Sequence, residues 1–372
     1  MIPRTLSRRR LLKVASVGGL ATVSGALLYA YAPWVNYEAK ANQARDVFPL
    51  DHPQTELIRY ATLAASGHNT QPWKFAFLPD SNVIEIHPDY ARCLPSVDPS
   101  NRELWISLGC ALENLRIAAL ASGLSPTITY PDTTDSISVQ LSKDTPQTSP
   151  LFEAIPLRQN TRSEYDGQSL KSQERELLEA VGREPGITLQ FLFDPPGVGQ
   201  LEELVRQGNL SQFADKAFLK ELVSWIRFNK REALASLDGL YAPCSGSPQV
   251  PRWLGKLFIE STTPQKQAAS DTKKLLSSSG AVVISSAGES KSDWVRTGQV
   301  YERLALTLTS HGLTSAFLNQ PIEVAKVRSQ LQSALGLGSL HPQLIVRFGT
   351  AEPLPRSLRR PVEQVLFKEM SS

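Results

Sequence analysis

The strongest constraint on the fold of this chain is a sequence pattern that occurs twice, 189 residues apart. The first copy runs from Trp105 to Leu124 and the second from Trp294 to Leu313, and six positions agree in identity and spacing without a gap. Both copies carry apolar residues at helical spacing, and both close on Gly-Leu, where glycine suits the left-handed residue that ends a helix. The repeat predicts two like units in one chain, packed as the two subunits of a homodimer would pack.

Each copy of the pattern predicts one long central helix, over residues 98–123 in the first unit and 292–312 in the second. Asp98 or Ser100 is expected to cap the first helix at its N-terminus. A glycine stands at the same place in both copies, which would let the two helices approach closely. Chance similarity between two amphipathic helices is the alternative explanation.

The remaining elements predict a mixed α+β fold with antiparallel sheets, arranged as two tandem units in an intramolecular pseudo-dimer. Strands are expected at 73–78, 83–86, 136–141, 187–193, 281–284 and 343–348, and further helices at 54–65, 172–182 and 213–231. The polar stretch 142–150 is expected to link the halves, so that residues 46–145 form the first and 151–372 the second. Residues 240–255, rich in Pro, Gly and Ser, are expected to be irregular, with a lid over a site as one option.

The first 45 residues have the character of an export signal. Residues 7–13 read S-R-R-R-L-L-K and follow the twin-arginine pattern S-R-R-x-F-L-K, and the uncharged apolar stretch 14–32 comes next. We expect recognition by the twin-arginine (Tat) export machinery and a location in the periplasm or at the outer face of the inner membrane. Pro33 would obstruct cleavage after Ala32, and an uncleaved 14–32 is long enough to tether the protein in the bilayer. An accidental basic cluster before a core helix is the alternative.

The positive charge of the chain belongs to this leader. The net charge is +3, but residues 1–45 hold seven basic side chains and one acid, which leaves 32 basic against 35 acidic residues in the body. The body therefore has no electrostatic footprint for a nucleic acid. Its three cysteines lack CxxC spacing and its five histidines lack ligand spacing, so neither a disulfide framework nor a metal site is expected.

A loop of small and amide residues precedes the strand expected at 73–78. Residues 66–73 read S-G-H-N-T-Q-P-W and offer a hydroxyl, carboxamides and backbone N–H groups without a charge. Such groups can line the edge of a planar heterocycle that alternates donors and acceptors. Taken alone, the stretch could equally be a well-made turn.

Two arginine clusters have the chemistry to bind a phosphate. Residues 158–162 read R-Q-N-T-R, and two arginines four residues apart can clamp a phosphate bidentately. Near the C-terminus Arg359 and Arg360 are further candidates, ahead of Arg356 and Arg347. Together these side chains carry more positive charge than one phosphate needs, so some are expected to be solvated. The alternative is that the arginine pairs lie on the surface and bind no ligand.

These motifs resemble those of the FMN-dependent nitroreductase family. The loop is similar to the family's P-S-S-x-N-x-Q-P-W motif, with matches at Ser66, Asn69, Gln71, Pro72 and Trp73 and departures at Ala65 and Gly67. Arg158, Asn160 and Arg162 resemble the family's R-x-S-x-R element, with Asn160 in place of Ser. The resemblance covers nearly all of the chain beyond the leader and is closest to the fused-repeat, Acg-like branch.

In nitroreductase dimers the loop and the arginine element of one flavin site come from different subunits. Here the first half has the loop and the second half has the arginines, while the first half lacks the arginine element and the second lacks the loop motif. The resemblance therefore implies one FMN site shared by the two halves. It implies FMN contacts from Ser66, Gly67, Asn69, Gln71, Arg158, Asn160, Arg162, Arg359 and Arg360. It also places a backbone N–H of Asn319 or Gln320 near the flavin N5. No catalytic acid or base is required, because the hydride moves directly to or from the flavin.

The function implied by the resemblance is an oxidoreductase that passes a hydride or electrons to a small electron-poor acceptor, such as a nitroaromatic or a quinone. Outside the cytoplasm NAD(P)H is not normally present, so an exported enzyme would need another donor, for instance a quinol or a redox protein. The alternative is a flavoprotein that sequesters or stores FMN without turnover. A fusion that has lost its cofactor is a third interpretation.

Overall fold

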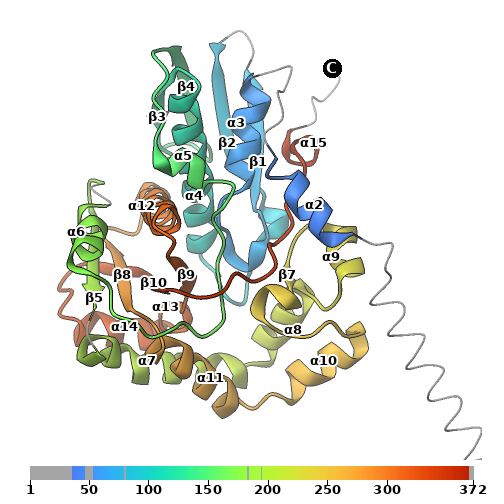
Figure 1. Ribbon diagram of the computed structural model, residues 1–372, viewed down its shortest axis with the longest axis vertical. Coiled ribbons are helices and arrows are strands. Elements are labelled where there is room, and N and C mark those ends of the chain that lie inside the picture. The colour runs from blue at the N-terminus through green and yellow to red at the C-terminus, as the bar shows by residue number, and fades with distance from the viewer. Residues whose placement is uncertain (1–35, 47–52, 79–80, 182–183, 194, 368–372) are drawn as a thin grey trace, which may run out of the picture.

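The computed structural model describes residues 36–46, 53–78, 81–181, 184–193 and 195–367. Two antiparallel four-stranded sheets lie on either side of a pair of long helices, so that the layers run sheet, helix, helix, sheet (Figure 1). The predicted α+β fold with two tandem units is confirmed. The twin-arginine motif and the apolar stretch 14–32 lie outside the described residues.

The two sheets share one topology. The order in the first sheet is β1 (Trp73–Leu78), β2 (Val83–Pro88), β4 (Ile137–Lys143), β3 (Leu124–Thr129). The order in the second sheet is β5 (Ile187–Leu192), β8 (Gly280–Ser286), β10 (His341–Gly349), β9 (Thr314–Phe317). In both units the long helix follows the second strand along the chain, and the last strand inserts between the second and the third. The repeat seen in the sequence is therefore a repeat of the fold.

The long helices α4 (Arg102–Ala121) and α12 (Lys291–Ser310) pack backbone to backbone. A Cβ built on Gly109 would lie 2.0 Å from the carbonyl oxygen of Val295, and one on Gly298 would lie 2.0 Å from the carbonyl oxygen of Ile106. Ile106 and Val295 are themselves equivalent positions of the repeat. The contact is thus reciprocal, as at the isologous interface of a two-fold dimer.

Helix α4 begins later than expected, yet Asp98 still caps it. The residue before the helix is Asn101, with φ of 58°, rather than Asp98 or Ser100. Asp98 reaches over this residue, and its Oδ2 accepts a hydrogen bond from the Leu104 N–H at 2.9 Å. Among the described residues α4 alone is long and apolar enough to cross a membrane, but 83% of that window is buried inside the protein, as in a core helix.

The second unit carries a helical insertion between β5 and β8, where the first unit joins β1 to β2 through residues 79–82. It comprises α7 (Pro195–Ala214), α8 (Lys216–Trp225), α9 (Lys230–Ser236), α10 (Arg252–Ser261) and α11 (Pro264–Leu276), with β6 (Ile226–Arg227) paired to β7 (Leu240–Tyr241). The single helix predicted over 213–231 is wrong. The side chain of Asp215 caps a new helix by accepting from the Ala217 N–H at 2.8 Å, and α8 ends where β6 begins.

The remaining helices are short or lie at the edges of the two units. They are α2 (Tyr37–Gln43), α3 (Pro53–Thr62), α5 (Pro150–Ala154), α6 (Ser172–Ala180), α13 (Gln320–Glu323), α14 (Ala325–Ala334) and α15 (Val362–Val365). After β10 the chain runs back to the first unit, where the Phe367 N–H donates to the Phe75 carbonyl at 2.9 Å. This C-terminal arm, residues 350–367, therefore ties the second predicted half to the sheet of the first.

Candidate functional site

A cavity of about 720 Å³ lies at the seam between the two units. One wall consists of residues 65–68, which follow α3, and of the start of α4. From the second unit Arg162, residues 316–320 and Arg347 line the cavity, and the insertion adds parts of α8, α10 and residues 240–250. Its volume lies within the range of roughly 300–1,000 Å³ that cofactor and small-molecule sites occupy.

The loop between α3 and β1 has a strained backbone. His68, Asn69 and Gln71 have φ values of 48°, 52° and 53°. The left-handed region costs a residue with a Cβ about 1 kcal/mol or more, and such strain persists only where the surroundings fix it, most often at functional sites. The structure of the loop is therefore imposed by its contacts.

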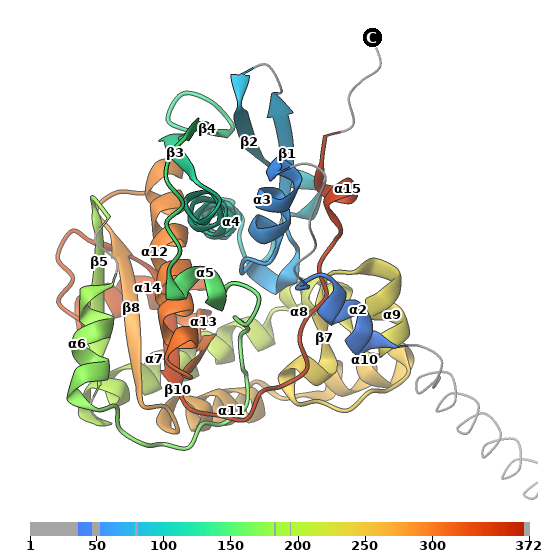
Figure 2. The same cartoon turned by 45° about the horizontal axis from the view of Figure 1, so that its top comes forward.

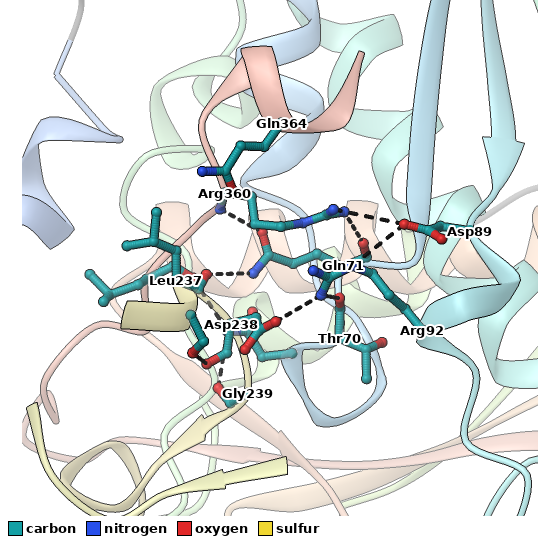
Figure 3. Close-up of polar contacts among 12 residues, drawn as sticks. Thr70, Gln71, Asp89, Arg92, Leu237, Asp238, Gly239, Arg360 and Gln364 are labelled. Atoms are coloured by element: carbon teal, nitrogen blue, oxygen red, sulfur yellow. Dashed lines mark hydrogen bonds and ion pairs between the residues drawn. The ribbon is translucent and has the colours of Figure 1, made fainter. Parts of the chain in front are cut away.

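The amide side chains of this loop bind the protein and do not line the cavity. Gln71 is fully buried; its Nε2 donates to the Leu237 carbonyl at 2.9 Å, and its Oε1 accepts from the backbone N–H of Arg360 at 2.8 Å (Figure 3). Asn69 donates through Nδ2 to the Gly239 carbonyl at 3.1 Å. The two residues expected to contact FMN thus hold the loop against the C-terminal arm and the turn 237–239.

Ser66, Gly67 and His68 are the loop residues that line the cavity. A Cβ on Gly67 would meet the nearest atoms at 3.5 Å, which is ordinary contact, so a side chain as small as serine has room there. Burial, and after it the neighbouring charge of Arg162, lowers the pKa of His68 to about 4. The imidazole is therefore neutral at neutral pH and leaves the positive charge of this wall to Arg162.

Arg162 is the expected phosphate ligand that faces the cavity. Its guanidinium makes no hydrogen bond or ion pair with any residue of the described ranges, and burial lowers its pKa. Two further cations line the same cavity. Arg347 stacks 3.9 Å from the Tyr165 ring and keeps a buried Nε without a partner, and Lys274 lies 3.1 Å from Asp271. Sequence analysis ranked Arg347 behind the C-terminal pair and missed Lys274, which carries no motif.

The turn that holds Arg158 and the loop that holds Asn69 lie side by side, as expected for parts of one site. Arg158 donates to the Leu63 carbonyl at 3.0 Å, and its Nε lies 2.9 Å from the buried carboxylate of Glu302. Asn160 accepts a hydrogen bond from the Tyr301 hydroxyl at 3.0 Å. Neither Arg158 nor Asn160 lines the cavity, so their expected contacts with FMN stay predictions.

The C-terminal arginines also bind protein atoms. Arg359 donates to Asn69 Oδ1 at 2.9 Å and to the carbonyl of Ala64 at 3.2 Å. Arg360 donates to the Gln71 carbonyl and lies 3.8 Å from Asp89 (Figure 3). Neither lines the cavity. In this structure the pair fixes the strained loop, because Arg359 and Arg360 bond backbone carbonyl groups on both sides of it and that of Gln71 within it.

A buried carboxyl group and two amide side chains also line the cavity. Burial, and after it the nearby charge of Glu323, raises the pKa of Glu103 to about 8, although Arg102 lies 2.9 Å away. Asn319 and Gln320 line the cavity as well, and Gln320 keeps a buried Oε1 without a partner. Sequence analysis missed Glu103. Its spacing to Ser107 and Cys110, four and seven residues on, would have placed it on the helix face toward the seam.

No protein-family model matches the chain. It is 27% identical over 329 residues to a Mycobacterium tuberculosis protein provisionally named NAD(P)H nitroreductase Rv3131, covering 84% of this chain and 92% of that one. The chain is similar to nitroreductases. The likeness extends, at 23% identity over 323 residues, to the provisionally named NAD(P)H nitroreductase acg of the same organism, covering 83% of this chain and 93% of that one.

Solved structures give weaker likenesses. A provisionally named nitroreductase of Anabaena variabilis aligns with a TM-score of 0.49 at 9% identity, covering 84% of this chain and 91% of that chain. The FMN-dependent nitroreductase NfnB of Mycobacterium smegmatis, in complex with NADPH, aligns with a TM-score of 0.37 at 13% identity, covering 55% of this chain and 88% of that chain. TM-scores below 0.5 do not establish a common fold.

Proposed function

We propose that this protein binds one FMN in the cavity at the seam and acts as an oxidoreductase on a small electron-poor acceptor, such as a nitroaromatic or a quinone. The observation that carries the proposal is the arrangement of the cavity walls. Residues 66–68 from one unit and Arg162 from the other line the same cavity, and Arg162 makes no hydrogen bond or ion pair with the described residues. The similarity to proteins named as nitroreductases over more than four-fifths of the chain supports the same reaction class.

The residues of the cavity fit FMN. Arg162, with Arg347 and Lys274 beside it, would supply the positive charge that a phosphate needs. The backbone of residues 66–68 and the amides of Asn319 and Gln320 would supply hydrogen-bonding groups for the edge of a heterocycle. When bound, FMN supplies the hydride or electron transfer, so the protein's part is to bind, to orient and to exclude water.

Glu103 would serve as a proton-holding group in this cavity. Because its pKa is raised to about 8, its carboxyl group is protonated at neutral pH and can donate a hydrogen bond. Reduction of a quinone or a nitro group consumes protons as well as electrons. A buried protonated acid that lines the cavity offers one of them.

We further propose that the chain is exported by the Tat machinery and works at the outer face of the membrane. The support is the S-R-R-R-L-L-K sequence followed by the uncharged stretch 14–32. The names of the relatives point to NAD(P)H as donor in those proteins. An exported protein would instead take its electrons from a donor present outside the cytoplasm.

A flavin reoxidation experiment separates turnover from storage. The full chain, purified and loaded with FMN, is reduced with dithionite under anaerobic conditions and then mixed with menadione or a nitroaromatic. We expect the flavin absorbance to return at a rate that rises with acceptor concentration. A bound flavin that stays reduced in the presence of every acceptor would establish sequestration. Shielding of the flavin by α10 and residues 240–250, which line the cavity, would be consistent with that result. A chain that binds no FMN would refute both.

A further inference from the structure

Helix α10 exposes large apolar side chains on the surface of the protein. Trp253, Leu257 and Phe258 are 66%, 56% and 54% exposed, the three highest values among the exposed large hydrophobic residues in the described ranges. Trp253 and Leu257 stand one helical turn apart on one side of the helix, and Phe258 lies about 100° further around it, toward the cavity. Figure 1 shows α10 at the outer edge of the insertion, away from both sheets.

The opposite side of α10 packs against the protein, and this packing holds Trp253 and Leu257 on the exposed side. A Cβ on Gly255 would lie 2.0 Å from Cδ1 of Phe228, which leaves no freedom for the helix to turn its apolar side inward. Arg252, at the start of the helix, lies 2.9 Å from Glu232 on α9 and donates to the Val223 carbonyl at 3.1 Å. These contacts fix the direction in which Trp253 and Leu257 point.

The composition of the exposed side suits the surface of a lipid bilayer. Helices that lie in a membrane interface combine Trp, Phe and Leu on one side with Lys and Arg at its border. Here Arg252 and Lys256 are exposed on α10 itself, paired with Glu232 and Glu260, and Lys266 is exposed near the start of α11. The basic residues would contact anionic headgroups while the apolar side chains enter the boundary between headgroups and acyl chains.

The N-terminal part of the chain enters the described structure at the same end of the molecule. Helix α2 packs against α9, and its Tyr37 ring stacks on Tyr241 of β7 at 4.2 Å (Figure 2). The Arg252–Glu232 ion pair joins α9 to α10. Asn36 stands four residues after the uncharged stretch 14–32. Four residues span at most about 14 Å. A bilayer that held 14–32 would therefore lie within reach of this end.

We propose that the apolar side of α10 docks on the surface of a lipid bilayer and that lipid-dissolved quinones reach the cavity from that side. Phe258 and Ile259 connect the two, because both belong to α10 and both line the cavity. The docking needs no flavin and stands by itself. Quinone access rests on the proposed function: the quinone would take a hydride from the reduced cofactor and one proton from Glu103, which solvent reprotonates, and it would leave as the quinol.

The depth of α10 in a membrane tests the docking. The full chain carrying Cys93→Ser and Leu257→Cys is spin-labelled and added to vesicles of phosphatidylethanolamine with phosphatidylglycerol. A matched sample carries the label at Leu78→Cys, an exposed leucine on β1 of the first sheet. We expect the label at 257 to gain contact with oxygen and lose contact with a water-soluble nickel chelate, with no change at 78.

Two results would overturn the docking. A label at 257 that stays fully accessible to the nickel chelate in the presence of vesicles shows that α10 remains in water. A label shielded from both reagents without vesicles shows that protein covers the helix, either a second copy or the segment 14–32. Replacing phosphatidylglycerol by a zwitterionic lipid should weaken the contact if Arg252 and Lys256 take part.

A double substitution tests the route to the cavity. Trp253→Ser with Leu257→Ser removes the apolar side of α10 without changing a cavity residue, and Leu78→Ser is the matched control. In vesicles containing ubiquinone, we expect flavin reoxidation to slow more than tenfold in the double variant, with no change toward a water-soluble nitroaromatic. Equal rates with ubiquinone would overturn the route. A flavin that no acceptor reoxidises, with the label at 257 still immersed, would refute the proposed function and leave the docking intact.

Discussion

The seam between the two units has two edges that the repeat makes equivalent, and the structure treats them differently. One edge holds the cavity and carries small or neutral side chains at Ser107, Cys110 and Asn319. At the other edge the positions 189 residues away are occupied by Arg296, Gln299 and Tyr130. The Tyr130 hydroxyl donates to Gln299 at 2.9 Å, and the Arg296 guanidinium lies 4.1 Å from the Tyr130 ring. Large side chains thus fill the edge opposite the cavity.

The equivalent glutamates Glu113 and Glu302 show the same division. Burial opposes ionisation of Glu113, but Arg116 and Arg303 outweigh it and lower the pKa of its carboxyl group. Burial dominates at Glu302 and raises its pKa despite the Arg158 charge. Glu302 also accepts the Ala65 N–H at 3.3 Å, at the start of the cavity loop. Fusion of two units in one chain allows one edge to be stabilised by paired charges while the other supports a site.

We expect the largest effect on stability from Gly109→Ala, because Gly109 lies at the close contact between α4 and α12 that both edges share. The new Cβ would overlap the Val295 carbonyl, and a backbone atom of a packed helix cannot move aside without separating the units. We expect a loss of about 3 kcal/mol or more in the free energy of unfolding, measured by urea denaturation. The control is Gly199→Ala on α7, where nothing lies within 4 Å and the exchange should be neutral or stabilising.

Glu103→Gln should change how stability depends on pH. The folded pKa of about 8 exceeds the ordinary pKa of 4.5 of a glutamate side chain, so the folded state favours the protonated carboxyl group. The unfolding free energy of the natural chain should therefore fall as the pH rises from about 4.5 to about 8, by on the order of 2–4 kcal/mol, and stay level above. The Gln variant should lack this decline. A variant with the same pH profile as the natural chain would show that Glu103 does not hold a proton in the folded state.

Arg162→Ala should weaken FMN binding by about 10- to 100-fold, the loss expected for one charge-assisted contact to a phosphate. Stability should change little, because Arg162 makes no hydrogen bond or ion pair with the described residues. Fluorescence titration with FMN measures the affinity. Arg206→Ala, which removes an exposed arginine that pairs with Glu203, serves as the control and should bind FMN normally. Equal affinity in both variants would remove Arg162 from the site.

Tyr130→Ala should have the smallest effect. It tests whether the size of the Tyr130 side chain is the only reason that the second edge binds no FMN. Truncation of this half-buried ring should cost about 1–2 kcal/mol, less than for a fully buried aromatic residue. The number of FMN molecules bound per chain should stay at one, because the opened edge has no counterpart of Arg162. A second FMN in the variant would show that Tyr130 alone blocks an otherwise complete site.

The repeat made the architecture predictable, whereas the outer wall of the cavity could not be predicted. Six matched positions fixed the two long helices and, with the strand patterns beside them, the two sheets. Phe218, Phe228 and Phe258 line the cavity from the helical insertion, where no motif or repeat marks them. The helix predicted over 213–231 failed because a capping Asp inside an apolar run is invisible to periodicity.

The site motif was located by sequence, but the direction of its side chains was not. A carboxamide can bond a heterocycle or a backbone carbonyl equally well, and only the fold decides between them. Asn69 and Gln71 turned toward the protein because three left-handed residues needed support, which the C-terminal arm and the turn 237–239 supply. Arg162 and Asn319 face the cavity because they lie where the two units meet.

The most direct test of the account is the number of FMN molecules that one full chain binds, obtained from flavin absorbance and protein concentration after equilibration with excess FMN. Because large side chains fill one of the two equivalent edges, we expect one FMN molecule per chain. Arg162→Ala should abolish or strongly weaken this binding. A value of two, or a chain that binds no FMN under any condition, would contradict it.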